Sequence, residues 1–330
     1  MNRVMPSATS AVLGLAAELR EAGRPVISLG AGEPDFDTPD HIKQAAIEAI
    51  HQGETKYTAI DGTSHLKAAI QRKFERDNQL RYAPEQILVS VGAKHTLFNA
   101  CMGILGPGDE AIVPAPYWVS YPDMVRVAEG TPVIIDTGIE DGFKVTPGKL
   151  EAAITERTRL LFLNSPSNPT GSCYTRDELA ALGEVLLKHP DVVILADDIY
   201  EHIHWADEPF CSLATACPDL YDQVVTINGV SKCYAMTGWR VGYAGGPPEV
   251  IKAMKTIQSQ ITSNPCSISQ VAAAAALDGD QACMTPMLEA YKTRSDYVVA
   301  ALNDIPGFEC REGEGAFYAF PRVTAAMAAK

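Results

Sequence analysis

The sequence lacks long hydrophobic runs and paired cysteine motifs. Its longest unbroken apolar run, Val271–Leu277, is far shorter than the roughly 20 residues that a membrane-spanning helix needs. None of its eight cysteines stands in a C-x-x-C pair or beside a histidine at metal-site spacing. That usage is typical of reduced thiols in the cytoplasm. We therefore expect a cytoplasmic protein with no metal site and no membrane span.

Positive charge is also scarce. The chain has 41 acidic and 27 basic residues, which gives a formal net charge of -14 at pH 7. Such a field repels the phosphates of nucleic acids and the surfaces of anionic membranes, so neither is an expected partner. A small anionic ligand is still allowed, because a local group of basic side chains and helix N-termini can bind it.

The N-terminal region resembles a secretory signal only at the lower limit of length. Arg3 precedes the apolar stretch Ala11–Ala17, but the pattern continues through Glu18 and Arg20 and stops at Gly23. An amphipathic helix that ends at a glycine explains this pattern better.

Short apolar runs recur between helical patterns along the 330 residues. Most are apolar on successive residues, which indicates strands buried on both faces, as in a parallel sheet covered by helices. We predict a three-layer α/β domain with a seven-stranded, mainly parallel sheet. The predicted strands are Ile87–Val91, Ala111–Val113, Pro132–Ile135, Leu160–Leu163, Val192–Ala196, Val224–Ile227 and Val241–Ala244.

One crossover helix has clear boundaries. Thr175-Arg-Asp-Glu178 is a capping box, and Pro190 follows the end of the helical pattern. The helix separates a strand that ends near Asn164 from one that ends near Asp197. Both strand ends should therefore open on the same edge of the sheet, where ligand sites of this architecture lie.

The chain divides into three predicted segments. Residues 1–37 form an N-terminal segment of a smaller domain, residues 38–283 a large domain, and residues 284–330 the start of the smaller α/β domain. Within the last segment we predict a helix over Met284–Leu302 and a strand over Ala316–Phe320. The smaller domain is expected to be incomplete.

The densest chemical signal is Ser231-Lys232-Cys-Tyr-Ala-Met-Thr-Gly-Trp-Arg240. A lysine with a lowered pKa can form a Schiff base, and the cationic charge of Arg240 lowers it. Ser231 and Arg240 can together hold a phosphate. A lone lysine in such a place is more often a solvated surface residue.

This segment resembles the pyridoxal-phosphate lysine motif of class I aminotransferases, in particular the bacterial aspartate aminotransferase branch. The resemblance runs over nearly the whole chain and implies the fold-type-I architecture of pyridoxal-phosphate transferases. It rests on an ordered set of motifs: Pro6-Ser-Ala-Thr9, Ala31-Gly-Glu-Pro-Asp-Phe36, Thr55-Lys-Tyr57, Val91-Gly-Ala-Lys94, Pro116-Tyr-Trp118, Asn164-Ser-Pro-Ser-Asn-Pro-Thr-Gly171, Asp197-Asp-Ile-Tyr200 and Gly315-Ala-Phe-Tyr318.

The resemblance implies a role for each residue around the cofactor ring. Lys232 carries pyridoxal 5'-phosphate, and Asp197 holds the pyridine nitrogen protonated. Tyr200 and Asn168 bind the ring 3-oxygen, and Trp118 stacks on the ring. Judged alone, Asp197 is equally well read as a helix N-cap, and Tyr200 would more often be a core residue.

The resemblance also implies a phosphate site and a dimer. The backbone N–H groups of Ala93 and Lys94 lie at a helix N-terminus and bind the phosphate with Ser231 and Arg240. Tyr57 reaches the phosphate of a neighbouring subunit, which implies a homodimer with shared sites.

Substrate residues follow from the same resemblance. Gly32 closes over the substrate, and Trp118 and Asn168 lie beside it. The side chain of Lys94 contacts the distal carboxylate of an acidic substrate, and Thr9 is a weaker candidate. The implied activity exchanges the amino group between L-aspartate and 2-oxoglutarate, giving oxaloacetate and L-glutamate, by a ping-pong mechanism with Lys232 as anchor and base.

Two departures from the family pattern stand out. The family's arginine for the substrate α-carboxylate lies well beyond Gly315–Tyr318, and the chain ends before it; Arg322 does not sit in that motif. We therefore expect a C-terminally shortened aminotransferase. Met5 stands where relatives that accept prephenate carry lysine, which favours aspartate over prephenate.

Two alternatives stay open. The same fold supports other reactions on the same cofactor, such as a carbon–sulfur β-lyase or an aminotransferase for other amino acids. The other alternative is a cofactor-binding but catalytically weak fragment, because the expected arginine is missing.

Overall fold

A seven-stranded sheet organises the protein. The computed structural model describes residues 4, 8–30 and 32–328, although not the side chains of residues 8 and 9. Spatial strand order is β1-β7-β6-β5-β4-β2-β3, and β7 runs antiparallel to both of its neighbours while the remaining pairs are parallel. The strands are β1 (Ile87–Ser90), β2 (Glu110–Ala115), β3 (Thr131–Asp136), β4 (Thr158–Asn164), β5 (Val193–Asp197), β6 (Val224–Gly229) and β7 (Gly242–Gly245). The predicted strands and the mainly parallel sheet are confirmed.

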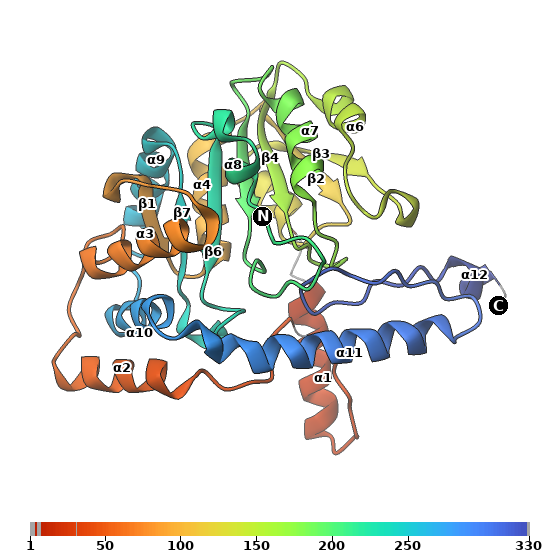
Figure 1. Cartoon of the computed structure of the whole chain (residues 1–330), viewed down its shortest axis with the longest axis horizontal. Helices are drawn as coiled ribbons and strands as arrows, with labels where there is room; N and C mark the ends of the chain where they lie inside the picture. Colours follow the sequence, from red (N-terminus) through yellow and green to blue (C-terminus); the bar gives the residue numbers. More distant parts are fainter. Residues whose placement is uncertain (1–3, 5–7, 31, 329–330) are drawn as a thin grey trace.

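Helices cover both faces of this sheet (Figure 1). One face is covered by residues of α4, α5 and α9. The other face is covered by residues of α2, α3, α6, α7, α8 and α10. The helices are α1 (Ala8–Glu21), α2 (Asp40–His51), α3 (Ser64–Asn78), α4 (Ala93–Ile104), α5 (Tyr121–Val127), α6 (Pro147–Ala153), α7 (Arg176–Leu186), α8 (Leu213–Ala216), α9 (Pro248–Ile261), α10 (Ser267–Asp278), α11 (Thr285–Asn303) and α12 (Thr324–Ala328).

Each central strand buries side chains on both faces. On β4, Leu160 and Phe162 pack toward α4 and α5, whereas Leu161 and Leu163 pack toward the opposite helices. This is why the strand is apolar on successive residues instead of alternate ones. The sequence pattern therefore identified the three-layer arrangement for the correct physical reason.

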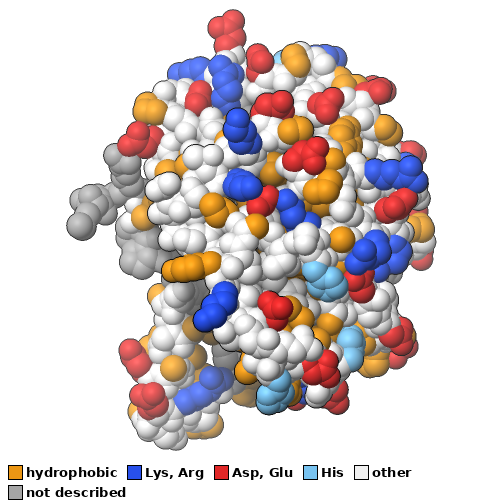
Figure 2. Space-filling view, turned by 90° about the vertical axis from the view of Figure 1, so that its left-hand side faces the viewer, with side chains coloured by type: hydrophobic (Ala, Val, Ile, Leu, Met, Phe, Trp, Pro, Cys, Tyr) orange, Lys and Arg blue, Asp and Glu red, His pale blue; other side chains and the backbone are white. Residues whose placement is uncertain are grey.

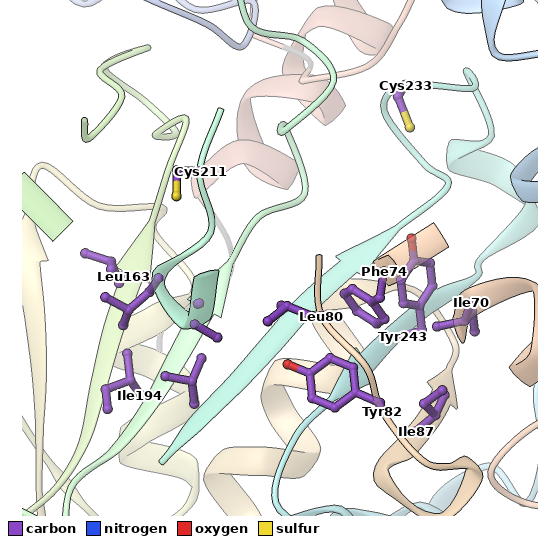
Figure 3. Packing of buried hydrophobic residues seen from close by; sticks show 14 of the residues in the cluster. Ile70, Phe74, Leu80, Tyr82, Ile87, Leu163, Ile194, Cys211, Cys233 and Tyr243 are labelled. Atoms are coloured by element: carbon purple, nitrogen blue, oxygen red, sulfur yellow. The ribbon is translucent and has the colours of Figure 1, made fainter. Parts of the chain in front are cut away.

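An aromatic group anchors α3 on the sheet. The ring of Phe74 meets the rings of Tyr82 and Tyr243 edge-on, with centroid distances of 5.0 and 5.6 Å (Figure 3). Edge-on contacts of this kind add to the stabilisation from buried area.

Buried charges tie α3 to the turn after β5. Lys73, only 1% exposed, pairs with Glu201, and the Asn78 amide donates to the second Glu201 oxygen at 2.8 Å. Burial alone would raise the pKa of Glu201, but the Lys73 ammonium and His202 lower it to about 2. Breaking one partner of such a pair leaves an uncompensated buried charge, so the network fixes the turn that carries Tyr200.

The same network bears on the expected absence of a metal. Asp77, Glu201 and His202 bring three donor atoms close together, but the Lys73 ammonium lies beside Glu201 and supplies the positive charge there. The absence of a metal site stays a prediction.

Two predicted helix ends are confirmed. Thr175 caps α7, where its side chain accepts from the Glu178 backbone and the Glu178 side chain accepts in return. Gly23 follows α1 with a φ of +75°, a left-handed conformation that glycine adopts without strain.

The C-terminal part lies against the turns after β5. The long helix predicted near Met284–Leu302 is α11, which crosses the lower half of the view in Figure 1, with the last segment returning above it. Its Met287 and Tyr291 pack on Ile199 and Tyr200. The boundaries proposed at residues 37/38 and 283/284 stay a prediction.

The strand predicted over Ala316–Phe320 is wrong. In this part of the described chain only single bridges form, one of them between His204 and Gly315. Ala316 has a φ of +58°, which interrupts an extended chain. Phe317 and Tyr318 pack on Tyr200, so their apolar character serves a small aromatic group and not a sheet.

The surface mixes charges of both signs. On the face shown in Figure 2, acidic and basic side chains are interspersed, and hydrophobic side chains lie in small groups between them. Among the helices of the described residues, none is both long and apolar enough to span a membrane.

Candidate active site

A cleft of about 930 Å³ opens at the carboxyl ends of the parallel strands. Asn164 and Asp197, the last residues of β4 and β5, stand opposite each other in the sheet register, as predicted from the crossover helix. Most of the candidate residues line this cleft: Gly32, Ala93, Lys94, Trp118, Asn168, Asp197, Tyr200, Ser231, Lys232 and Arg240.

Lys232 lies in the turns that follow β6 and points its ammonium into the cleft. Its Nζ donates to the carbonyl oxygen of Gly32 at 2.5 Å and lies 5.9 Å from the centroid of the Tyr200 ring. Burial, together with the charge of Arg240, lowers the pKa of Lys232 to about 8, although Glu33 and Asp197 oppose this change. A larger fraction of the amine is therefore neutral near neutral pH than in an ordinary lysine, which is what a nucleophilic lysine needs.

Asp197 ends β5 inside the protein and is only 4% exposed. Its Oδ2 accepts from the Tyr121 hydroxyl at 2.6 Å, while its Oδ1 is buried without a hydrogen-bond partner. Burial raises the pKa of this carboxyl to about 6, although the Tyr121 hydroxyl, the Ile199 backbone and Lys232 lower it. A buried oxygen without a partner is costly, so the site is built for a donor that binds there.

A chain of hydrogen bonds links three polar side chains above Asp197. The hydroxyls of Tyr200 and Tyr318 lie 2.6 Å apart, and the Asn168 amide donates to the Tyr318 oxygen at 3.3 Å. Asn164 supports this arrangement, because its side chain accepts from the Asn168 backbone and donates to the Asp197 carbonyl. The chain places hydroxyl and amide groups along one wall of the cleft.

Trp118 and Lys94 meet on another wall. The Lys94 ammonium lies 4.7 Å from the centroid of the Trp118 ring, a cation–π contact. Burial, aided by the charge of Arg240, lowers the pKa of Lys94. Two neighbouring cations here make this end of the cleft attractive to anions.

A close-packed backbone surrounds the N-terminus of α4. Gly92 precedes the helix with a φ of +83°, and a Cβ at this position would lie 2.3 Å from the Arg240 guanidinium. A Cβ on Gly242 would lie 2.2 Å from the Ala93 nitrogen. Both glycines let Arg240 and the first turn of α4 approach each other. A helix N-terminus beside an arginine and the buried Ser231 is a suitable site for a phosphate.

Some candidates lie elsewhere. Tyr57 is 92% exposed and is not among the residues lining the cleft of its own chain. Arg322 pairs with Glu140 and Glu309 outside the cleft. Neither the side chain of Thr9 nor Met5 falls within the described part of the chain.

Three further side chains belong to the site although the sequence predicted no role for them, namely those of Tyr121, Asn164 and Tyr318. Asn164 and Tyr318 stand inside motifs that were recognised as such, and Tyr121 follows Trp118 by three residues. Tyr121 carried no signal of its own, because a tyrosine at the start of a short helix usually packs in a core.

These residues fit pyridoxal 5'-phosphate. The unpartnered Asp197 Oδ1 suits a protonated ring nitrogen, and the glycine-lined cradle at Arg240 suits the phosphate. Lys232, with its lowered pKa, suits attachment of an aldehyde.

Comparison with known proteins identifies the family. The family model for class I and II aminotransferases matches residues 24–330. The chain belongs to the class I and II aminotransferase family. It is therefore an enzyme that transfers amino groups, built on the fold-type-I architecture.

Several members of this aminotransferase family resemble the chain over most of its length. The aspartate/prephenate aminotransferase of Nitrosomonas europaea is 58% identical over 98% of this chain and 82% of its own. A solved aspartate aminotransferase from Rhizobium meliloti superposes with a TM-score of 0.95 at 53% identity, covering 98% of this chain and 82% of its own. The enzyme of Thermus thermophilus, solved with maleate, gives a TM-score of 0.92 at 44% identity, covering 97% and 84%.

The raised pKa of Asp197 predicts that Asp197→Asn stabilises the cofactor-free aminotransferase. Because the folded-state pKa of about 6 exceeds the ordinary value of 3.8, folding penalises the charged carboxylate above pH 6, and the penalty disappears as the pH falls toward 3.8. We expect the variant to gain about 1–3 kcal/mol in unfolding free energy at pH 8 and nothing near pH 4. Denaturant unfolding at both pH values measures this. A loss of stability at pH 8 would contradict it.

Proposed function

We propose that this aminotransferase uses pyridoxal 5'-phosphate bound as a Schiff base to Lys232, and moves the amino group of L-aspartate to 2-oxoglutarate in two half-reactions. The observation that carries the proposal is the pairing of Lys232 with Asp197 in one cleft. A lysine with a pKa of about 8 faces into the same cavity as a buried carboxylate that lacks a partner for one oxygen. A buried lysine and a buried, unpartnered carboxylate oxygen both cost stability. A bound pyridoxal ring would give each of them a partner.

When bound, the cofactor supplies an aldehyde that takes up the substrate amino group and a ring that stabilises negative charge at the substrate α carbon. The chain supplies the other parts. Lys232 Nζ would hold the cofactor and, as a free amine, would move the proton of the substrate α carbon. Asp197 keeps the ring nitrogen protonated, and Tyr200 and Asn168 donate toward the ring oxygen.

Phosphate and ring contacts follow the walls of the cleft. The N-terminus of α4 at Ala93 and Lys94, with Ser231 and Arg240, binds the phosphate. Trp118 covers one face of the ring. Gly32, whose carbonyl accepts from Lys232, borders the substrate.

A dicarboxylate substrate suits the charge of the cleft. The cleft is lined by the cations of Lys94, Lys232 and Arg240 among its described residues. The Thermus thermophilus relative was solved with maleate, a four-carbon dicarboxylate, and the Rhizobium meliloti relative is named aspartate aminotransferase. We therefore assign Lys94 to the distal carboxylate of aspartate.

The proposal includes a homodimer in the cytoplasm. Tyr57, exposed on its own subunit, is then the residue that reaches the phosphate of the neighbouring subunit. At 92% exposure, Tyr57 is accessible to a neighbouring subunit.

Prephenate is a second candidate substrate. Two relatives that are 58% and 59% identical to the chain are named aspartate/prephenate aminotransferases. Met5 argues for aspartate alone. A direct comparison of the two substrates decides between them.

The first experiment is a spectrum of the purified chain with pyridoxal 5'-phosphate. We expect a visible absorption band that Lys232→Ala loses and that Lys188→Ala, a surface control, keeps. Aspartate alone should convert the cofactor to its amine form, because the first half-reaction needs no oxo acid, and 2-oxoglutarate should then restore the band. A band that ignores aspartate would favour the alternative of a cofactor-binding protein with little activity.

Replacing Lys94 tests the substrate. Lys94→Ala should raise the KM for aspartate about 10- to 100-fold, because a charge-assisted contact worth roughly 1.5–3 kcal/mol is lost. The KM for alanine or for a sulfur amino acid should change little. Equal changes for all substrates would contradict the assignment and favour an aminotransferase or β-lyase for other amino acids.

A further inference from the structure

Tyr121 makes the shortest side-chain contact to the buried carboxylate of the site. Its hydroxyl donates to Asp197 Oδ2 at 2.6 Å, and Asp197 Oδ1 is left without a partner. Tyr121 is itself only 3% exposed and begins α5. The two oxygens of one carboxylate therefore have different surroundings before any cofactor binds.

Packing fixes the direction of the Tyr121 hydroxyl. Its ring stacks on Phe162 of β4, with centroids 4.6 Å apart, and meets Trp118 edge-on at 5.5 Å. Its backbone nitrogen donates to the Trp118 carbonyl at 3.0 Å. Because these contacts fix the Tyr121 ring, its hydroxyl oxygen has a fixed position. The hydrogen bond from this hydroxyl therefore also fixes the Asp197 carboxylate.

We propose that Tyr121 is a positioning residue, which fixes the Asp197 carboxylate, keeps it ionised and leaves Oδ1 free to meet the ring nitrogen of the cofactor. This inference rests on the proposed function, because it concerns the carboxylate assigned to that nitrogen. Tyr121 itself acts through Asp197 and not on the substrate.

Other groups also influence Asp197, but none of them takes the place of Tyr121. Lys232 attracts the charge across the cleft, while Tyr200, Tyr318 and Asp198 interact with it from the turns around β5 and the C-terminal segment. Burial raises the pKa of Asp197, and the Tyr121 hydrogen bond is the strongest opposing influence. Burial and the charge of Asp197 raise the pKa of Tyr121 well above its ordinary value, so its hydroxyl stays a donor at neutral pH.

The test starts with cofactor-free protein. Across the pH range, the unfolding free energy of the wild-type protein is compared with that of Asp197→Asn, and that of Tyr121→Phe with the same variant that also carries Asp197→Asn. Each difference reports the titration of Asp197 alone. In Tyr121→Phe we expect the midpoint of this difference to rise by about one pH unit, because the charged form loses its hydrogen bond. At pH 5, where the Asp197 carboxyl of both proteins is mostly protonated before the cofactor binds, a rise of one unit lowers the ionised fraction about tenfold, so the affinity for pyridoxal 5'-phosphate measured at that pH should fall about tenfold.

Tyr82→Phe is the matched control. Tyr82 is also buried, and its hydroxyl lies 3.0 Å from Thr226 Oγ1, so this variant loses an equivalent hydroxyl contact away from the cleft. It should lose stability without moving the Asp197 midpoint or the cofactor affinity.

A Tyr121→Phe protein with the wild-type midpoint and wild-type cofactor affinity would overturn the inference and leave Tyr121 a packing residue. Failure of the proposed function has a different signature, because the wild-type protein would then not bind the cofactor at all.

Discussion

The site depends on one buried carboxylate, of which only one oxygen has a hydrogen-bond partner. Asp197 ends a strand in the middle of the sheet, where water does not reach it and where burial alone would neutralise it. Tyr121 satisfies one oxygen, and the other is left open toward the cleft. Folding must supply the stability to hold such a group, and the two apolar layers of the sheet do so.

The rest of the architecture places partners around that carboxylate. Parallel strands β4, β5 and β6 bring Asn164, Asp197 and the Lys232 turn to a single edge, because crossover connections return each strand in the same direction. The buried Lys73–Glu201 pair then fixes the turn that follows β5. The position of Tyr200 in the cleft therefore depends on the Lys73–Glu201 pair, which lies on the other side of the same turn.

Sequence patterns predicted the sheet well, because its strands are apolar on both faces and its crossover helix has a capping box. They also placed most of the cleft residues, since these stand at strand ends and in motifs of the family. The strand expected over Ala316–Phe320 failed, because the aromatic residues there pack on Tyr200 across a bend at Ala316. Tyr121 escaped notice, because its role depends on the spatial approach of α5 to the end of β5, which no local pattern reports.

The most direct measurement is the chemical location of the cofactor. The protein is loaded with pyridoxal 5'-phosphate, the linkage is reduced with borohydride, and the labelled peptide is identified by mass spectrometry. The account predicts a single label on Lys232, the lysine with a lowered pKa that shares a cleft with Asp197. A label on Lys94 instead, or labels spread over surface lysines, would contradict it.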